Sequence, residues 1–529
     1  MTYQDPENLI RPRVMGRHTQ LSSYKYYGGL AKKGMLWSLT QEGVNVLLTL
    51  PTLVILARLL SPKEFGIAAA ASFFIQLANR LTKFGFNTAL LRMKAIRPEH
   101  ASTVFVVSIV MGVLSWVVLA SAAPWVGAFF RSPETAQVLP VAALTFVISS
   151  FGTVPSALLS RALIIGPRTV IDWLGAVTYT VSTATLAWSG FSFWSLVYGE
   201  VLRSLVTTAA VIYCTGWTMS FRFSRPALDE MFSFGMGIYA KRLLEYAASN
   251  ADSLVVGRVL GVASLGLYDK AFGSMTKVVG WLTLAGPSIA FRIFVLVQAD
   301  TERFRAAYRK LLLSVTLVGY PCLTWFILVA PTLFLVGFGE RWVPASYAFQ
   351  ILAVAGMMKL LNAYASVAMQ ARDLIWNEVS RQIGYLVVLV VGVAIGTRWG
   401  VSGAAAGVLV ASVMMWVLMH ELLRRAGPLT WRDLLAPQIP AVFGCIGISA
   451  TVAVVDWSVQ ALAPRPWQVL AIKGVAAGIF YAAYVFKGPF SETQTLVSET
   501  VEDLIPHIPW IASRRKSTKP NSAGATLAS

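Results

Sequence analysis

Apolar stretches of about 20 residues, the length that crosses a lipid bilayer as a helix, recur along almost the whole chain. Hydrophobic residues make up 56% of the chain and charged residues only 13%, against about 25% charged residues in ordinary soluble domains. The sequence therefore predicts an all-α integral membrane protein with about 14 transmembrane helices. They are expected near residues 34–57, 66–91, 101–123, 137–160, 170–189, 191–214, 231–256, 265–290, 310–330, 345–370, 377–397, 401–422, 435–455 and 467–486.

The basic residues indicate how the chain is oriented. The formal net charge is +19, which in a soluble protein would suggest nucleic acid as a partner. With the N-terminus placed inside, 27 Lys and Arg residues fall in cytoplasmic segments and 7 in outside connections. Basic residues collect on the cytoplasmic side of membrane proteins. We therefore predict a multi-pass protein of the cytoplasmic membrane with both termini inside, no cleaved signal peptide and no nucleic-acid partner.

An internal repeat predicts how the helices are organised. ARLLSPKEFGIA at 57–68 aligns without a gap with GRVLGVASLGLY at 257–268, so that Arg58 matches Arg258 and Gly66 matches Gly266. The offset of 200 residues corresponds to six spans, an even number, so both copies face the same way. This predicts two six-helix lobes in a parallel pseudo-repeat, followed by two further helices.

The predicted segments follow from this repeat. They are a basic cytoplasmic arm (1–33), an N-lobe (34–215), a C-lobe (230–424), two C-terminal helices (435–486) and a cytoplasmic tail (488–529). In the twelfth span, Gly403, Gly407 and Ala411 form a face of small residues, which predicts close packing against another helix.

Two spans at corresponding places in the repeat carry polar, basic stripes on one helical face. The residues are Gln76, Arg80, Lys83 and Asn87 in the second span and Lys270, Ser274 and Lys277 in the eighth. If the lobes face each other, the stripes line one central cavity, and Arg and Lys side chains there suit phosphate or diphosphate oxygens. The alternative is that some of these cations extend to the membrane surface or pair with local acids.

The first and seventh spans differ in their ionisable groups. Arg242, Glu245, Ser249 and Asp252 share one face of the seventh span, whereas the first span carries Glu42, Asn45, Thr49 and Thr52 at the matching positions. A carboxylate that takes up a proton or Na⁺ could gate one lobe, and Asp269 is a further acid at membrane depth. The alternative is a structural ion pair. We expect Glu200 and Arg203 to form a buried structural pair, and Lys473 to extend to the membrane surface.

Several motifs of catalysis are missing from the sequence. It contains no GxxxxGK[ST], HExxH, CxxC or GxSxG. The three cysteines lie apart in apolar runs, and none of the four histidines is near another. We therefore expect neither an enzyme nor a nucleotide-driven pump, and no cofactor apart from a coupling H⁺ or Na⁺.

Three stretches of the sequence resemble a known family, the Wzx-type oligosaccharide flippases of the multidrug/oligosaccharidyl-lipid/polysaccharide exporter superfamily. They are VILARLLSPKEFGIAAAASFFIQLANRLTKFGFNTALLR at 54–92, NADSLVVGRVLGVASLGLYDKAF at 250–272, and PSIAFRIFVLVQADTERFRAAYRKLL at 287–312 together with LVAPTLFLVGFGERWVPASYAFQILAVAG at 328–356. The resemblance implies a fourteen-helix, two-lobed fold that moves an undecaprenyl-diphosphate-linked oligosaccharide to the outer leaflet by alternating access. It also implies cavity cations that hold the diphosphate, at Arg80 and Lys83 and, by helix position, at Lys241, Arg242 and Lys270.

Two other functions remain open at this point. A cation-coupled exporter of drugs or other small molecules could use the same fold, although such exporters favour acidic cavities and the stripes here are basic. A membrane scaffold for polysaccharide assembly would let the intramembrane charges be neutralised without effect. The expected partners are lipid-linked oligosaccharide, membrane lipids, and a polysaccharide polymerase or other export machinery.

Overall fold

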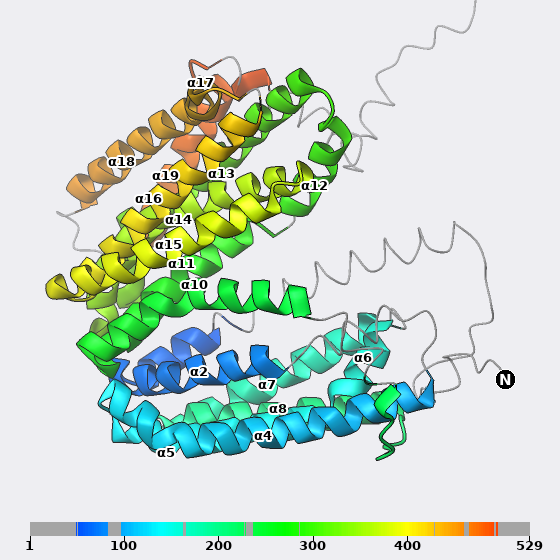
Figure 1. Ribbon diagram of the computed structural model, residues 1–529. Coiled ribbons are helices and arrows are strands. Elements are labelled where there is room, and N and C mark those ends of the chain that lie inside the picture. Colours follow the sequence, from blue (N-terminus) through cyan, green and yellow to red (C-terminus); the bar gives the residue numbers. More distant parts are fainter. Residues whose placement is uncertain are drawn as a thin grey trace, which may run out of the picture. The chain divides into compact units, whose positions relative to one another are not determined.

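The computed structural model describes residues 49, 51–82, 97–161, 165–226, 228, 236–284, 286–427, 429–459, 465–490 and 493–495. The described residues form α-helices and short 3₁₀ helices and contain no strand, which confirms the all-α prediction (Figure 1). Seven helical stretches in the described residues are long and apolar enough to cross a membrane, or nine if each of two bent pairs is one span. One of the seven, Trp376–Ala426, holds two helices, so the count of fourteen stays a prediction.

The chain divides into two compact units, and each is described by itself below. The first unit comprises Met1–Met275, Leu333–Ala355 and Val379–Met415. The second comprises Thr276–Thr332, Gly356–Glu378 and Trp416–Ser529. The predicted division into two six-helix lobes stays a prediction.

Long helices that lie side by side form the first unit (Figure 1). α4 (Pro98–Phe130) packs along α5 (Pro133–Ser150), and α7 (Ile165–Trp188) packs along α8 (Trp194–Thr215). α2 (Pro62–Thr82) contacts α4, α5 and α10 (Met236–Leu260). These helices enclose the cavity described below.

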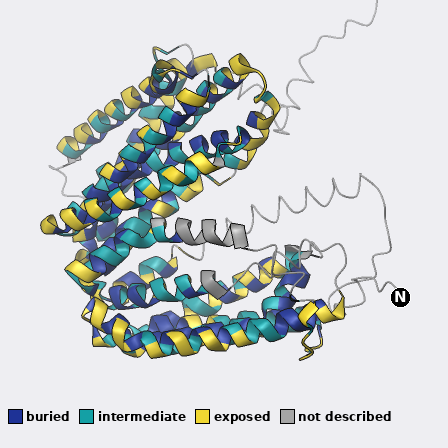
Figure 2. Cartoon of the chain, viewed as in Figure 1, coloured by how far each residue is buried: buried dark blue, intermediate teal, exposed yellow. Residues whose placement is uncertain are grey.

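The outer face of α4 shows what surrounds this unit. Val110, Leu114, Val117 and Val118 are spaced as one helical face, and all four side chains are exposed (Figure 2). The helix buries Val104, Phe105 and Leu119. A continuous exposed stripe of aliphatic residues fits contact with lipid chains, because lipid, unlike water, does not penalise apolar exposure.

One predicted span is broken in two. The sequence predicts a single helix over 137–160, whereas α5 ends at Ser150 and α6 (Thr153–Arg161) continues at an angle of 52°. The break falls at Phe151 and Gly152, where the Gly152 amide donates to the Ser149 carbonyl at 3.0 Å. This tight turn ends the regular helical ladder, and hydropathy alone does not reveal it.

The two repeated turns pack against each other. A Cβ placed on Gly66 would lie 1.6 Å from the Val262 carbonyl oxygen, and one on Gly266 would lie 1.9 Å from the Pro62 carbonyl oxygen. Both contacts join residues that are equivalent under the 200-residue offset, so a local two-fold axis relates the turns. The structure thus confirms that 57–68 and 257–268 are repeats, and it explains why glycine stands at both positions.

Each repeat also supplies an arginine to a helix C-terminus. Arg258 Nη1 donates to the Phe129 carbonyl at 2.7 Å, at the end of α4. Arg58 donates to the carbonyls of Val336 and Gly337, near the end of α13 (Thr301–Phe338). The last carbonyls of a helix have no partner within the helix, and a guanidinium satisfies them and the negative end of the helix dipole together.

The beginning of α2 is held by a reciprocal capping arrangement, in which the Glu64 amide donates to Ser61 Oγ at 3.4 Å. The Ser61 amide donates to Glu64 Oε2 at 2.6 Å, and the Ser192 hydroxyl donates to Glu64 Oε1. Burial acts to raise the pKa of the Glu64 carboxyl, but these hydrogen bonds outweigh it and hold that pKa below its usual range. Glu64 precedes the predicted span.

Within the first unit, the end of one helix and the beginning of the next form a tight hairpin. α15 (Ile375–Gly396) and α16 (Gly400–Ala426) meet through glycines: a Cβ on Gly403 would lie 2.1 Å from the Gly396 carbonyl oxygen, and one on Gly407 would lie 2.4 Å from that of Gly392. The close packing predicted from the small residues of the twelfth span is therefore confirmed.

In the second unit, α18 (Ile439–Val459) packs against α19 (Pro466–Lys487). Lys473, expected to extend to the membrane surface, is instead 5% exposed, and its Nζ lies 2.6 Å from Asp456 Oδ1. The expectation was wrong because it considered α19 alone, whereas the carboxylate comes from the neighbouring helix.

The glycine contact gives a prediction about stability. Gly266→Ala places a methyl group against backbone rather than a flexible side chain, so we expect it to lower the free energy of unfolding by about 1–3 kcal/mol. Gly273→Ala in α11 (Val262–Leu282) is the matched control, because its Cβ meets nothing within 4 Å. Thermal unfolding of the two purified variants measures the difference. Equal midpoints would contradict the described contact.

Candidate functional site

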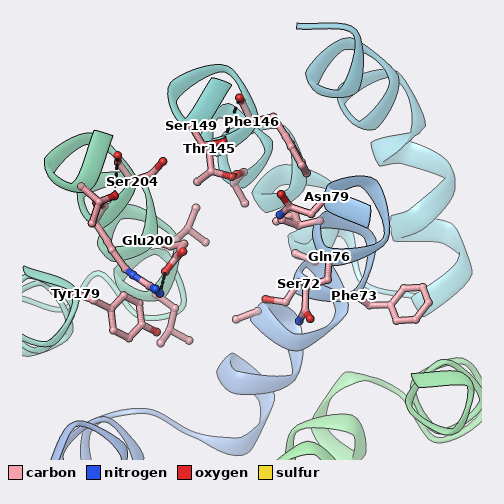
Figure 3. A pocket seen from close by; sticks show the side chains of 18 of the residues that line it. Ser72, Phe73, Gln76, Asn79, Thr145, Phe146, Ser149, Tyr179, Glu200 and Ser204 are labelled. Carbon is pink, nitrogen blue, oxygen red and sulfur yellow. Dashed lines mark hydrogen bonds and ion pairs between the residues drawn. The ribbon is translucent and has the colours of Figure 1, made fainter. Parts of the chain in front are cut away.

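A polar pocket of about 920 Å³ lies within the first unit. It extends from Phe65, near the repeated turns, to Arg168 at the beginning of α7. Much of its wall consists of hydroxyl and amide side chains, among them Ser72, Gln76, Asn79, Thr145, Ser149 and Ser204 (Figure 3). Such groups both donate and accept hydrogen bonds. The pocket therefore suits a ligand rich in hydroxyl groups.

Helical spacing brings these groups to one wall. Ser72, Gln76 and Asn79 are four and three residues apart on α2, so they share the face that lines the pocket. Across the pocket lie Tyr179 of α7 and Glu200 of α8 (Figure 3). An aromatic ring, a carboxylate and amides thus face one another.

The side of the pocket formed by α8 carries an ion pair. Arg203 Nη1 lies 3.2 Å from Glu200 Oε2, and both residues line the pocket. The pair is the one predicted from their spacing. The expected burial was wrong, because the side chains are 50% and 49% exposed and face a cavity that the sequence does not reveal.

Sequence reasoning missed two charged residues of the pocket. Arg168 falls between the predicted spans 137–160 and 170–189, but α7 begins at Ile165, and both Arg168 and Asp172 line the pocket. Their spacing of four residues on one helix could have indicated a shared face.

Most of the predicted cationic wall falls outside what the structure describes. Lys83, Asn87, Glu42 and Asn45 lie outside the described residues. The helical backbone of Arg80, Lys241, Arg242 and Glu245 is described, but their side chains are not. Gln76, by contrast, lines the pocket. The cationic wall therefore stays a prediction.

The two predicted lysines of the eighth span have other surroundings. Lys270, on α11, is 5% exposed, and its Nζ lies 4.5 Å, 4.6 Å and 5.0 Å from the ring centroids of Phe65, Phe338 and Trp342. Lys277 is half-buried two turns further along. Neither lines the pocket. A role for either in holding phosphate stays a prediction.

The predicted coupling carboxylates occupy contrasting places. Asp252 is 2% exposed, and its Oδ2 accepts a hydrogen bond of 2.5 Å from the Tyr268 hydroxyl. Tyr385 of α15 is within electrostatic range of it. Asp269 is exposed and lines the pocket. The described residues contain no cluster of three His, Cys, Asp or Glu side chains able to hold a metal ion.

Lipid-facing helices around a substrate-sized polar pocket define a multi-pass membrane protein of the transporter type. The profile of the family described as polysaccharide biosynthesis proteins matches residues 55–347, which is more than half of the chain. The chain belongs to this family.

Characterised relatives agree with that assignment. The chain is 24% identical to the lipopolysaccharide biosynthesis protein WzxC of Escherichia coli, over 73% of this chain and 79% of that protein. It is 25% identical to the succinoglycan biosynthesis transport protein ExoT of Rhizobium meliloti, over 61% and 65%. It is also 25% identical to the teichuronic acid biosynthesis protein TuaB of Bacillus subtilis, over 54% and 59%.

Solved structures place the fold. The lipid II flippase MurJ in an inward closed conformation superposes with a TM-score of 0.67 at 12% identity, over 89% of this chain and all of that one. A multidrug-resistance MATE transporter of the MOP superfamily superposes with a TM-score of 0.56 at 16% identity, over 72% and 95%. The fold is therefore the one that these transporters share.

The ion pair of the pocket gives a testable prediction. Half-exposed pairs contribute at most about 1 kcal/mol to stability, so Glu200→Gln should leave the amount of folded protein unchanged. We expect it to reduce transport, because it removes a charged hydrogen-bonding group from the pocket. Glu421→Gln is the control, since Glu421 pairs with Arg424 and Arg425 and does not line the pocket. Equal surface-glycan production by the two variants would count against a role for this wall.

Proposed function

We propose that this chain translocates an undecaprenyl-diphosphate-linked oligosaccharide across the cytoplasmic membrane, for the synthesis of a surface or exported polysaccharide. The observation that carries the proposal is a pocket whose wall combines apolar side chains with hydroxyl, amide and charged groups, within a protein of the polysaccharide biosynthesis family. The printed names of the relatives connect them with lipopolysaccharide, succinoglycan and teichuronic acid. A glycan is the ligand class that such a wall suits.

The two parts of this substrate need different chemistry. Sugar hydroxyls exchange hydrogen bonds with groups such as Gln76, Asn79 and the Glu200–Arg203 pair, and a sugar face can stack on Tyr179. The diphosphate needs cations, and here the proposal relies on Arg80, Lys83, Lys241 and Arg242. The lipid chain stays in the bilayer, against aliphatic faces such as that of α4.

The energy source in this proposal is a gradient of H⁺ or Na⁺, coupled through a buried carboxylate. Asp252 is the strongest candidate, because it is buried and because the Tyr268 hydroxyl of α11 donates a hydrogen bond to it. Neutralising this group changes the charge that the surrounding helices must accommodate. That supports its use as a coupling site, with Glu245 and Asp269 as further candidates.

Location and partners complete the proposal. The distribution of basic residues supports cytoplasmic termini and residence in the cytoplasmic membrane. A polysaccharide polymerase would receive the product on the outer side. A small-molecule exporter and a scaffold for polysaccharide assembly are the rival functions, and the tests below distinguish them.

Loss of the chain should trap its substrate. In a strain lacking this protein, we expect diphosphate-linked oligosaccharide to accumulate on the inner leaflet, where an impermeant reagent cannot reach it. Loss of charge-assisted bonds to phosphate should make Arg80→Ala and Lys83→Ala each reduce export about tenfold or more without loss of protein. Normal surface glycan in the double variant would contradict the phosphate role. Intact surface glycan in the deletion strain, without a trapped intermediate, would favour the small-molecule exporter.

Ion coupling has its own test. Asp252→Asn keeps the size of the side chain and a hydrogen-bond acceptor for Tyr268, but it cannot take up a proton or hold a cation by charge. We expect normal protein levels and transport in membrane vesicles that no longer responds to an imposed H⁺ or Na⁺ gradient. Applying each gradient separately identifies the ion. A variant that responds like the wild type would exclude Asp252 as the coupling group.

A further inference from the structure

Lys270 is held in an aromatic cage that four separate segments build. Phe65 comes from the beginning of α2, Phe338 from the last residue of α13, and Trp342 from the short helix η2 (Glu340–Trp342). The Leu53 carbonyl, in the helical residues 51–59, accepts a hydrogen bond of 3.4 Å from Lys270 Nζ. Lys270 itself belongs to α11. The ammonium therefore contacts α2, α13, η2 and residues 51–59 at the same time.

The cage has a physical basis in the cost of burying a cation. An ammonium that is 5% exposed loses most of its hydration, which is costly unless other groups replace the water. A cation over the face of an aromatic ring, within about 6 Å of its centroid, is attracted by the electron density of that face, most strongly where water is excluded. Lys270 Nζ lies over three such rings. These contacts are lost if the segments that carry the rings move apart.

The cage lies beside the meeting point of the repeated turns. Trp342 Nε1 donates to the Ala57 carbonyl at 2.8 Å, and the rings of Trp342 and Phe65 meet edge to face at 5.1 Å between centroids. Arg58, the next residue after Ala57, caps the end of α13. Any movement that separates residues 51–62 from α13 and η2 must break these contacts together.

The cage also adjoins the pocket. Phe65 is a wall of the cage and at the same time lines the pocket, and Asp269, next to Lys270 in the chain, lines it as well. The ammonium is thus close to the end of the pocket that lies nearest the turns. An anionic group at that end of the pocket would attract this cation.

We propose that Lys270 is a substrate-sensing latch. Its aromatic cage holds this end of the first unit closed, and the anionic diphosphate of a bound substrate draws the ammonium out of the cage and so favours opening. This inference rests on the proposed function for the identity of the anion, but the closing role of the cage does not. Lys270 acts as a positioning residue, because it couples occupancy of the pocket to separation of the helix ends.

The test follows access to the pocket from the side of the repeated turns. Ser72, in the pocket wall, is replaced by cysteine in a full-length chain whose three cysteines are changed to alanine. The probe is a membrane-impermeant maleimide, added on the side from which a Lys63→Cys variant is labelled. Lys63 is exposed in the first turn of α2, so this calibration makes the test independent of the orientation of the chain.

Three variants separate charge from shape. Lys270→Met keeps the length of the side chain and loses the cation, so we expect labelling of the Ser72→Cys chain to rise roughly tenfold, as loss of cation–π contacts of ordinary strength predicts. Lys270→Arg keeps the cation and should label at nearly the original rate. Lys63→Met removes an exposed lysine at the same end and should change nothing.

A second change guards against misfolding of the Lys270 variants. Phe338→Leu removes one ring of the cage and leaves the lysine in place, so it should raise labelling by a smaller factor, about threefold. Unchanged labelling in both Lys270→Met and Phe338→Leu, at normal protein levels, would overturn the latch. An equal rise in Lys270→Arg would overturn the role of the charge.

The role of the substrate is tested in a strain that makes no lipid-linked glycan. The latch predicts that the chain with native Lys270 is labelled several-fold faster when the glycan is made, whereas Lys270→Met is labelled fast in both strains. If labelling responds to the cage variants but not to glycan, the cage closes this end and the proposed substrate is wrong. If it responds to glycan equally with and without the ammonium, the proposed function stands and the sensing role of Lys270 is overturned.

Discussion

Helix C-termini end in carbonyl groups that have no partner in their own helix, and in this chain each repeat supplies those partners for a helix of the other half. Arg258 caps α4, and Arg58 caps α13. The glycines at 66 and 266 allow the two turns to pack backbone against backbone. The meeting of the turns therefore positions α2 and α11, and with them one end of the pocket.

The sequence predicted the features that depend on spacing along one helix or on the repeat. Arg58 and Arg258, Gly66 and Gly266, and the glycine face of α16 all have matching roles in the structure. Features that depend on a neighbouring helix were not predictable in this way. Lys473 finds its carboxylate on α18, and Lys270 finds its rings on α2, α13 and η2. In both cases the sequence shows only a single lysine in an apolar helix, and it does not indicate which partner the lysine contacts.

The Glu200–Arg203 pair marks the limit of sequence reasoning for the site. Spacing shows that the two side chains can pair, but whether a pair is buried or faces a cavity depends on what the other helices leave open. Here α2 and α5 turn hydroxyls and amides toward it, and a polar pocket results. Hydropathy does not identify such a wall, because serine and threonine are common in the apolar stretches throughout the chain. The predicted cations and this wall suit chemically different ligand groups, phosphate and sugar.

The glycine hairpin of α15 and α16 has a mechanical consequence. With Gly392 and Gly396 set directly against Gly407 and Gly403, no side chains stand between the two backbones to tilt or slide as the helices move. The two helices of the hairpin should therefore move together as one rigid body and not as two separate helices. Tyr385, on α15 of this hairpin, interacts electrostatically with the buried carboxylate of Asp252. A change in the charge of Asp252 would therefore act on a rigid pair of helices.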